Sequence, residues 1–304
     1  MTGTVHETGG GVYRVRLDSG EMVEASLRGR LKREVRTGSK VVIGDRVELD
    51  NSGSAWTVES VEERSTQLVR RGKGGRAPKL LAANLDRVFT VVAARDPPSS
   101  VELVDRLLVL AESSGIGPVL VINKVDLEGV AGDVEELISL YRGIGYTVLP
   151  VSAESGDGLE ELHQKLCDGI STLIGPSGVG KSSLLNAIDP ALSLRTGELS
   201  RKGGTGRHTT VGSRIITMAC GGFVADTPGF GEVGLWGVAP NEIGACFPEI
   251  AVRMDECRFR ACAHLSEPDC AIREAVEAGE IAGSRYRSYV TARAEADEAA
   301  KPDW

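Results

Sequence analysis

The chain has 304 residues, of which 41% are hydrophobic and 26% are charged, as in a folded globular protein and unlike a disordered or fibrous one. No apolar stretch approaches the length of a membrane span, and the polar N-terminus lacks the apolar core of an export signal. We therefore expect a cytoplasmic protein without a membrane partner, with room for one main domain and one or two small ones.

The net charge of −8 is spread unevenly along the chain. Residues 1–80 carry 15 Lys and Arg against 11 Asp and Glu, whereas the remainder carries 20 against 32. The low overall pI of 5.3 therefore does not exclude a nucleic-acid surface near the N-terminus. A solvated surface with local fluctuations in charge explains the same counts, so both interpretations stay open.

The first domain, residues 1–70, is predicted to be a small β-barrel. Short alternating or β-branched runs at 12–17, 21–25, 41–49 and 55–61 indicate about five strands between residues 3 and 66. An OB-fold fits such a segment best, although strand counting does not separate it from another small barrel. Residues 71–84 follow as a basic linker, because the stretch from Arg70 to Lys79 is rich in Gly and basic residues and poor in apolar ones.

Residues 85–238 have the texture of an α/β domain with a parallel sheet. The predicted strands lie at 88–93, 118–122, 147–151, 171–174 and 222–225, and the predicted helices at 101–113, 134–142, 159–167 and 182–188. A short motif follows four of these strands. Open α/β sheets bind ligands at the carboxyl ends of their strands, so these motifs are predicted to meet in one site.

The strand at 171–174 leads into Gly175-Pro176-Ser177-Gly178-Val179-Gly180-Lys181-Ser182, with Ser183 next. This segment matches G-x-x-x-x-G-K-S in full, with a predicted strand before it and a helix after it. Its backbone N–H groups and helix N-terminus suit phosphate oxygens. Lys181 is predicted to reach the β- and γ-phosphates and Ser182 to ligate Mg²⁺.

A second motif, Asp226-Thr227-Pro228-Gly229, follows the last predicted strand. Asp226 is predicted to hold Mg²⁺ through water, and the Gly229 N–H to contact the γ-phosphate. Phe230 comes next, and Phe cannot orient a water, so we expect slow unaided hydrolysis.

The Gly-rich segment before that strand offers the remaining catalytic candidates. Thr209 or Thr210 is the candidate Mg²⁺ ligand, and the sequence does not choose between them. His208 is the candidate that assists hydrolysis, with a solvated loop histidine as the competing interpretation.

A third motif, Asn123-Lys124-Val125-Asp126, ends the strand at 118–122. A carboxylate at Asp126 can accept from both N1–H and the exocyclic amine of guanine, and a site built around that pair penalises adenine. Ser152-Ala153 follows the next strand and is predicted to place a backbone N–H near guanine O6. Taken alone, the motif reads equally well as a loop that starts a helix.

These motifs stand in an unusual order along the chain. The base-reading Asn123–Asp126 precedes both the phosphate loop and the Asp226–Gly229 motif, whereas in an ordinary GTPase it follows them. The sequence therefore predicts a GTPase domain with a rotated order of elements.

Residues 239–304 are predicted to form a small α-rich domain around a metal. Cys257, Cys262, His264 and Cys270 offer three thiolates and one imidazole, a set that suits tetrahedral structural zinc. A set of buried thiols without an ion is the alternative. Cysteines elsewhere, namely Cys167, Cys220 and Cys246, are predicted to be small buried apolar residues without disulfides.

Together these residues resemble the circularly permuted GTPases of the RsgA (YjeQ) family, which act in late assembly of the small ribosomal subunit. The resemblance covers essentially the whole chain and is carried by 82–86, 103–108, NKVDL from Asn123, GPSGVGKSSLLN from Gly175, GRHTT from Gly206, DTPGF from Asp226 and the Cys/His cluster ending at Arg273. It implies an OB-fold, a permuted GTPase domain and a zinc domain. It also implies GTP hydrolysis stimulated by the small (30S) subunit, binding to its 16S rRNA and release after hydrolysis, and it places the assisting role on His208.

We expect a monomer that cycles between GTP and GDP with Mg²⁺ and carries one structural Zn²⁺. A GTP-gated binding module with incidental hydrolysis is the first alternative, and a P-loop kinase or ATPase of another class is the second. The rotated order also suggests a hypothesis, namely that the Asp226–Gly229 loop, which runs toward the Cys257–Cys270 region, couples nucleotide state to a docking domain.

Overall fold

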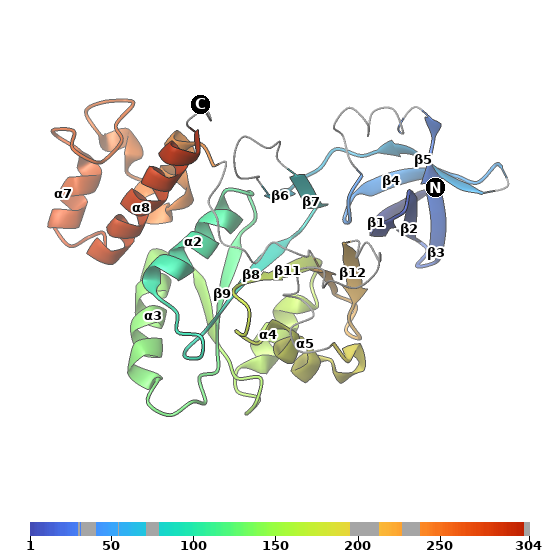
Figure 1. Cartoon of the computed structure of the whole chain (residues 1–304), viewed down its shortest axis with the longest axis horizontal. Coiled ribbons are helices and arrows are strands. Elements are labelled where there is room, and N and C mark those ends of the chain that lie inside the picture. Colours follow the sequence, from blue (N-terminus) through green and yellow to red (C-terminus); the bar gives the residue numbers. More distant parts are fainter. Residues whose placement is uncertain are drawn as a thin grey trace.

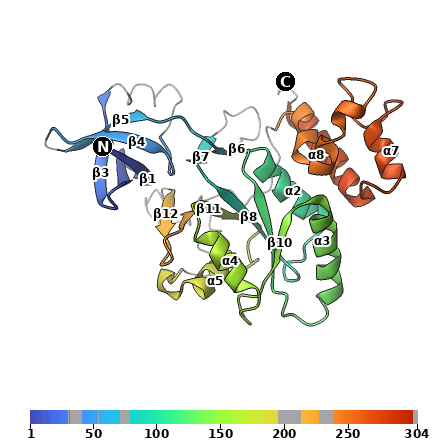
Figure 2. The same ribbon diagram turned by 180° about the vertical axis from the view of Figure 1, so that it is seen from behind.

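The computed structural model describes residues 1–29, 31, 41–53, 55–70, 79–194, 213–226 and 238–300. A central α/β domain lies between a β-barrel, at the right of Figure 1, and a helical C-terminal unit at its left (Figure 1). The same arrangement is seen from behind in Figure 2. Among the described residues, no helix is both long and apolar enough to span a membrane.

Five strands close the N-terminal barrel: β1 (Thr2–Gly9), β2 (Val12–Leu17), β3 (Met22–Leu27), β4 (Arg46–Asp50) and β5 (Trp56–Val61). They run in the order β1-β2-β3-β5-β4, and β4 pairs back onto β1. The β3–β5 pairing is parallel and the others are antiparallel. Alternating residues such as Val15, Val23 and Val58 fill the interior. This closed five-stranded topology confirms the predicted OB-fold.

A two-stranded hairpin of β6 (Gln67–Arg70) and β7 (Lys79–Ala83) follows the barrel. The sequence analysis placed 79–83 at the end of a linker, whereas the structure has a strand there. The physical reason is burial, because Leu68, Leu81 and Ala82 belong to the hydrophobic core of the α/β domain. The Ala83 N–H also donates to the Ile43 carbonyl at 3.0 Å, which attaches this hairpin to the barrel. Residues 71–78 of the predicted linker lie outside the described residues.

The sheet of the central domain has the order β10-β9-β8-β11-β13-β12. Its strands are β8 (Arg87–Ala93), β9 (Pro118–Asn123), β10 (Thr147–Pro150), β11 (Ile170–Ile174), β12 (Arg214–Thr217) and β13 (Phe223–Asp226). All pairings are parallel except β12–β13. The short β12, which the sequence analysis did not predict, follows a segment outside the described residues.

Helices cover both faces of this sheet. On one face, α2 (Val101–Glu112) and α3 (Ala131–Ile144) pack on residues such as Val88 and Val92. On the other face, α4 (Leu159–Leu166) and α5 (Lys181–Ile188) pack on Phe89 and Val91. Since successive side chains of β8 point to opposite faces, its continuous apolar run supplies both cores.

The C-terminal unit consists of short helices around one long one. It contains α6 (Pro248–Ala251), α7 (Ala271–Glu277), α8 (Gly283–Ala300) and 3-10 turns at Pro240–Glu242, Gly244–Cys246 and Met254–Glu256. Its core includes Phe247, Ile250, Tyr289 and the buried Cys246. Burial of Cys246 confirms the prediction for that cysteine.

Arg285 on α8 fixes this unit to α2. The Arg285 side chain is only 1% exposed. Its guanidinium donates to Asp105 of α2 at 2.5 Å and to Glu249 at 2.7 and 3.1 Å. Tyr141 also donates to Asp105 at 2.5 Å, and the Phe247 ring lies 4.6 Å from the guanidinium carbon. The C-terminal unit is therefore held on the central domain by a buried charge network, at a point remote in sequence from the Asp226 motif.

The barrel joins the central sheet through a short seam. Strand β1 pairs with β12 at a single position, Glu7 opposite Arg214, and the Thr8 N–H donates to the Ser213 carbonyl at 3.4 Å. Beside it, the buried His6 ring meets the Phe223 ring edge-on at 5.2 Å. Burial, with a smaller effect of Arg16, lowers the pKa of His6 to about 4, so this ring is neutral at neutral pH.

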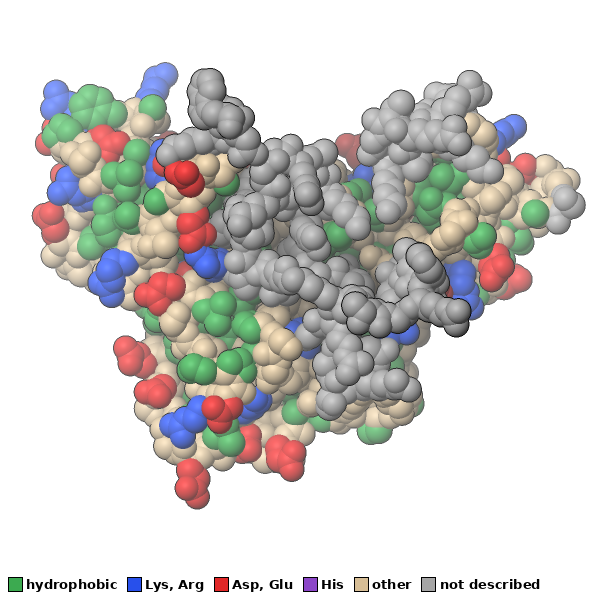
Figure 3. Space-filling view, in the orientation of Figure 1, with side chains coloured by type: hydrophobic (Ala, Val, Ile, Leu, Met, Phe, Trp, Pro, Cys, Tyr) green, Lys and Arg blue, Asp and Glu red, His purple; other side chains and the backbone are tan. Residues whose placement is uncertain are grey.

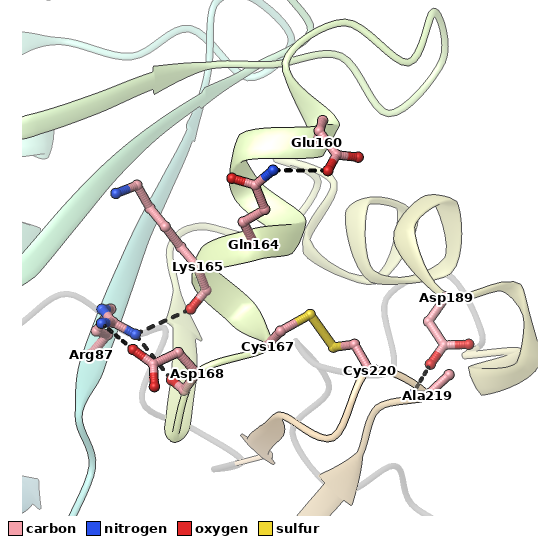
Figure 4. The surroundings of a disulfide bond; sticks show 9 residues. All are labelled: Arg87, Glu160, Gln164, Lys165, Cys167, Asp168, Asp189, Ala219 and Cys220. Atoms are coloured by element: carbon pink, nitrogen blue, oxygen red, sulfur yellow. Dashed lines mark hydrogen bonds and ion pairs between the residues drawn. A yellow bond between two sulfur atoms is a disulfide. The ribbon is translucent and has the colours of Figure 1, made fainter.

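One prediction about the cysteines is wrong. Cys167 and Cys220 form a disulfide, with their Cα atoms 5.5 Å apart (Figure 4). Cys167 directly follows α4, and Cys220 lies in the turn between β12 and β13. The two are 53 residues apart in sequence, and only the packing of that turn beside the end of α4 brings the sulfurs together.

Candidate nucleotide-binding site and metal centre

The predicted phosphate loop connects β11 to α5 at the carboxyl edge of the sheet. Gly175, Gly178 and Gly180 all have positive φ, a conformation that other residues rarely adopt. At Gly180 the requirement is also steric, because a Cβ there would lie 2.3 Å from Nδ2 of Asn123. Ser177 and Gly178 are exposed at the tip, whereas Val179 is fully buried in the core and anchors the loop.

Lys181, the first residue of α5, points back over this loop. Its ammonium group donates to the carbonyls of Gly175 and Pro176 at 2.8 and 2.9 Å. Burial lowers the pKa of Lys181 to about 8. Next to it, Ser182 is buried and Ser183 is half-buried. A desolvated cation at a helix N-terminus is an arrangement that binds phosphate groups.

Asn123 joins three of the predicted motifs. From the end of β9 its amide donates to the Val179 carbonyl in the phosphate loop at 2.8 Å. Its side-chain oxygen accepts from the Ala153 N–H at 3.2 Å. Because the Asn123 side chain is buried, it fixes the loop at 152–155 and the phosphate loop relative to each other. The Asn123–Asp126 motif predicts base recognition, and nothing in the motif indicates this bridging role.

The other residues that are predicted to contact the base lie beside Asn123. Lys124 has a φ of 66° and its ammonium group donates to the Asp96 carbonyl. Val125 is half-buried and Asp126 is exposed, so the Asp126 carboxylate is accessible to a ligand. The buried Ser152 accepts from the Glu154 and Ser155 N–H groups at 3.1 and 3.0 Å, which shapes the loop that presents Ala153. The loop after β8 was not foreseen in this role, since Asp96 and Pro97 carry no motif.

Asp226 ends β13 on the other side of the phosphate loop, since β13 is the sheet neighbour of β11. It is buried and pairs with Arg214 of β12 at 3.5 Å. Arg214 is a further residue that sequence reasoning missed. His208, Thr209, Thr210 and Gly229 lie outside the described residues, so the catalytic side of the site stays a prediction.

The predicted metal ligands do come together. The ligand atoms of Cys257, Cys262, His264 and Cys270 all lie within 4.8 Å of one another. The His264 Nδ1 lies 3.4 Å from the Cys257 sulfur and 3.6 Å from the Cys270 sulfur. The Cys257 and Cys270 sulfurs are 4.0 Å apart.

These separations fit a tetrahedral zinc site. Zn–S bonds of about 2.3 Å and Zn–N bonds of about 2.0 Å place ligand atoms roughly 3.5–3.8 Å apart. Burial raises the pKa of the Cys262 thiol to about 12, and a bound cation is what would stabilise thiolates packed this closely.

The loop that carries these ligands is held by its own hydrogen bonds. Although burial opposes its ionisation, backbone N–H donors from Ala263, Leu265 and Ser266 lower the pKa of Glu267 to about 2. Tyr286 and Tyr289 of α8 donate to the carbonyls of His264 and Ala263 at 2.6 and 2.7 Å. The cluster is therefore attached to α8, the helix that also carries Arg285.

Comparison with known proteins accounts for this combination of parts. The family model described as RsgA GTPase matches residues 61–236. The chain belongs to the RsgA GTPase family. It is therefore a P-loop GTPase, as the motifs predicted.

Relatives match over almost the full chain. A protein of Gemmatimonas aurantiaca named "Small ribosomal subunit biogenesis GTPase RsgA" is 44% identical, with 97% of each chain covered. A protein of Moorella thermoacetica with the same name is 43% identical over 97% of each chain.

Solved structures agree with the fold. YjeQ from Thermotoga maritima superposes with a TM-score of 0.80 at 36% identity, covering 97% of this chain and 98% of that one. YloQ, described as a circularly permuted GTPase, gives 0.77 at 30% identity, covering 100% of this chain and 96% of that one. The rotated motif order of this chain thus agrees with the description of YloQ.

Proposed function

We propose that this protein is a GTP hydrolase that binds the small (30S) ribosomal subunit and its 16S rRNA, assists late maturation of the subunit, and leaves it after hydrolysis. The proposal is carried by the relatives named as small ribosomal subunit biogenesis GTPases, which match over 97% of this chain. The Asn123 bridge supports the nucleotide half of the proposal, because it connects the phosphate loop to the predicted base-reading loops.

The roles of the site residues follow from their places at the strand ends. Asp126 would accept from guanine, Ala153 would donate to its O6, and the backbone of 175–180 would surround the phosphates. Lys181 would turn from the loop carbonyls to the β- and γ-phosphates. The predicted roles of His208 and Gly229 in hydrolysis belong to this proposal as well.

Two metals belong to the proposal. Mg²⁺ would be held by Ser182, by Thr209 or Thr210, and through water by Asp226. One Zn²⁺ would be held by Cys257, Cys262, His264 and Cys270. Four protein ligands leave no open position, so this zinc has a structural role.

We further propose a division into a barrel (1–70), a linker (71–84), the GTPase domain (85–238) and a zinc domain (239–304), in a cytoplasmic monomer. Several described barrel arginines form ion pairs, for example Arg46 with Asp18 at 2.6 Å and Arg14 with Glu7 at 3.2 Å, whereas Arg16 lies over the Phe223 ring. Figure 3 shows Lys and Arg interspersed with Asp and Glu over the described part of one face. Contact with rRNA would therefore draw on the basic residues of 32–40 and 71–78, outside the described ranges.

The test is GTP turnover with and without purified small ribosomal subunits. We expect weak basal turnover, strong stimulation at saturating subunits, and much weaker binding of ATP than of GTP. Turnover that saturating subunits leave unchanged would remove the assembly role. Equal affinities for ATP and GTP would instead favour a P-loop enzyme of another class and contradict the role of Asp126.

The second candidate is a GTP-gated binding module with incidental hydrolysis, favoured by the Phe230 that follows the Asp226–Gly229 motif. A His208→Ala variant separates the two. If hydrolysis drives release, this variant stays on the subunit with GTP; if hydrolysis is incidental, its cycling on and off is unchanged.

A further inference from the structure

The Cys167–Cys220 disulfide connects two parts of the GTPase domain that sequence order keeps apart (Figure 4). Cys167 is half-buried at the end of α4, and Cys220 is exposed in the turn between β12 and β13. The bond is therefore within reach of small thiols and disulfides. In a protein expected in a reducing compartment, such a bond is more often redox-responsive than a permanent structural disulfide.

Both ends of the bond are held in place by contacts that do not involve sulfur. Arg87 fixes the end of α4, because it donates to the Lys165 and Asp168 carbonyls at 3.2 and 2.9 Å. On the other side, Asp189 accepts from the Ala219 N–H at 2.7 Å, one residue before Cys220.

Backbone contacts add to this arrangement. The Phe223 N–H donates to the Gly169 carbonyl at 3.0 Å. A Cβ at Gly222 would lie 2.0 Å from the Leu166 carbonyl oxygen, so only glycine permits this approach. These contacts would keep the two thiols adjacent after reduction, which makes closure of the bond an intramolecular reaction.

The turn that carries Cys220 belongs to the β12–β13 hairpin. Strand β13 delivers Asp226, and Arg214 of β12 forms an ion pair with it. In the chain, the hairpin lies between the segment of Thr209 and Thr210 and that of Gly229. A bond from its turn to α4 therefore restrains the element that joins the two predicted Mg²⁺ and γ-phosphate segments.

We propose that Cys167 and Cys220 form a reversible thiol–disulfide site that low-molecular-weight disulfides oxidise. The oxidised site restrains the β12–β13 hairpin against α4 and slows GTP turnover. The effect on turnover rests on the proposed function, whereas the site itself does not.

The chemistry is a pair of exchange steps. The Cys220 thiolate attacks one sulfur of a small disulfide, and one small thiolate leaves. The Cys167 thiolate then attacks the Cys220 sulfur of the mixed disulfide, closes the protein bond and releases the second small thiolate. Two protein protons are lost, and the small disulfide takes up the two electrons. Cys220 is the first attacker because it is exposed, whereas Cys167 lies at a helix C-terminus, whose partial negative charge disfavours a thiolate.

The chemical test uses the zinc-loaded full chain, incubated with oxidised glutathione and mapped as unreduced peptides. We expect a Cys167–Cys220 cross-link that dithiothreitol reverses. In Cys167→Ser, a glutathione adduct should accumulate on Cys220 several-fold more than on Cys167 in Cys220→Ser. Cys246→Ser is the matched control and should behave as wild type. Two separately alkylatable thiols after oxidation would overturn the proposal.

A metal is the competing use of this cluster, because a ring nitrogen of His163 and both sulfurs lie within 4.8 Å of one another. The reduced protein should contain one Zn²⁺ per chain. A second equivalent that disappears in Cys167→Ser/Cys220→Ser would overturn the redox assignment.

The restraint of the hairpin by the disulfide is tested by amide hydrogen exchange across 213–226 and by thermal melting. Oxidation should slow exchange in this hairpin several-fold and raise the melting temperature by on the order of 5 °C. The double-serine variant should show neither change. Identical exchange in the oxidised and reduced proteins would contradict the proposed restraint of the hairpin.

GTP turnover with small subunits closes the test. Oxidised wild type should turn over several-fold more slowly than reduced wild type, while the double-serine variant is insensitive. Equal turnover in both redox states would contradict the proposal that the disulfide slows GTP hydrolysis. Absence of turnover in the reduced protein would contradict the proposed function instead.

Discussion

The phosphate loop and the Cys/His cluster are both short segments that gather polar groups, but they satisfy those groups in different ways. In the phosphate loop, Lys181 donates to the Gly175 and Pro176 carbonyls and Asn123 donates to the Val179 carbonyl. In the Cys/His cluster, the ligand atoms of Cys257, His264 and Cys270 contact mainly one another. The polar groups of the first segment are satisfied by the chain itself, whereas those of the second would be satisfied by the proposed zinc ion, so only the second is expected to couple its folding to its ligand.

The largest expected effect is on the metal side of this comparison. Chelation of zinc, or Cys257→Ser, should unfold the loop around the cluster and loosen α7 and α8, because structural zinc contributes on the order of 10 kcal/mol to such sites. Zinc content and amide exchange across 238–300 measure it. The matched control Cys246→Ser should keep its zinc. A C-terminal unit that stays protected without zinc would show that its helices fold without the ion.

The next effect concerns the attachment of the C-terminal unit to the GTPase domain. Arg285→Ala leaves Asp105 and Glu249 buried without their cation, which should cost about 3–5 kcal/mol of unfolding free energy. Denaturant unfolding gives this value, and Arg287→Ala, at an exposed position of the same helix, should change it little. If zinc is retained in Arg285→Ala while exchange rises in both α2 and α8, docking and metal binding are separable. An unfolding free energy that Arg285→Ala leaves unchanged would mean that other contacts hold the C-terminal unit on the central domain.

At the predicted nucleotide site, a substitution should weaken GTP binding and leave the stability of the fold unchanged. Asp126→Asn removes the carboxylate that we propose pairs with guanine, and it should weaken GTP binding by roughly 100-fold, equivalent to about 3 kcal/mol. The exposed Asp126 makes no described contact that the fold requires, so the denaturation midpoint should stay unchanged. Binding of a fluorescent GTP analogue measures the loss, with Asp133→Asn as a control at an exposed acidic position. Unchanged affinity would contradict the base-reading role.

Lys181→Met should also change the stability of the fold only slightly. A buried ammonium is costly even when it is hydrogen-bonded, so an apolar side chain of similar length should shift the unfolding free energy by no more than about 1 kcal/mol. GTP turnover should nevertheless be lost, because the phosphates would lose the cation that we propose binds them. A large loss of stability would mean that the phosphate loop depends on Lys181 for its fold, which would break the contrast with the metal centre.

Sequence patterns predicted what is local in the chain. The apolar runs of β8 and β9, the complete phosphate-loop motif and the four metal ligands within 14 residues are all short-range signals. The Asn123–Asp126 motif was recognised for its chemistry, although its bridge to Val179 spans 56 residues and leaves no local trace.

Pairings across long stretches of sequence escaped prediction. Arg285 and Asp105 are 180 residues apart, and Cys167 and Cys220 are 53 apart. Each partner taken alone resembles an ordinary surface charge or a small buried residue. The strand β7 escaped for another reason, because the basic, Gly-rich stretch beside it dominated the composition of the segment. Only the packing of the folded chain distinguishes these residues from their neighbours.

The seam between β1 and β12 has a mechanical consequence. The barrel is attached to the rest of the chain both at this residue pair and at the β6–β7 hairpin, where the Ala83 N–H donates to the Ile43 carbonyl. At the seam, Glu7 and Arg214 are paired beside the neutral ring of His6. Arg214 pairs with the barrel through its backbone and with the Asp226 carboxylate through its side chain, so a movement of the barrel and the position of that carboxylate are coupled through one residue.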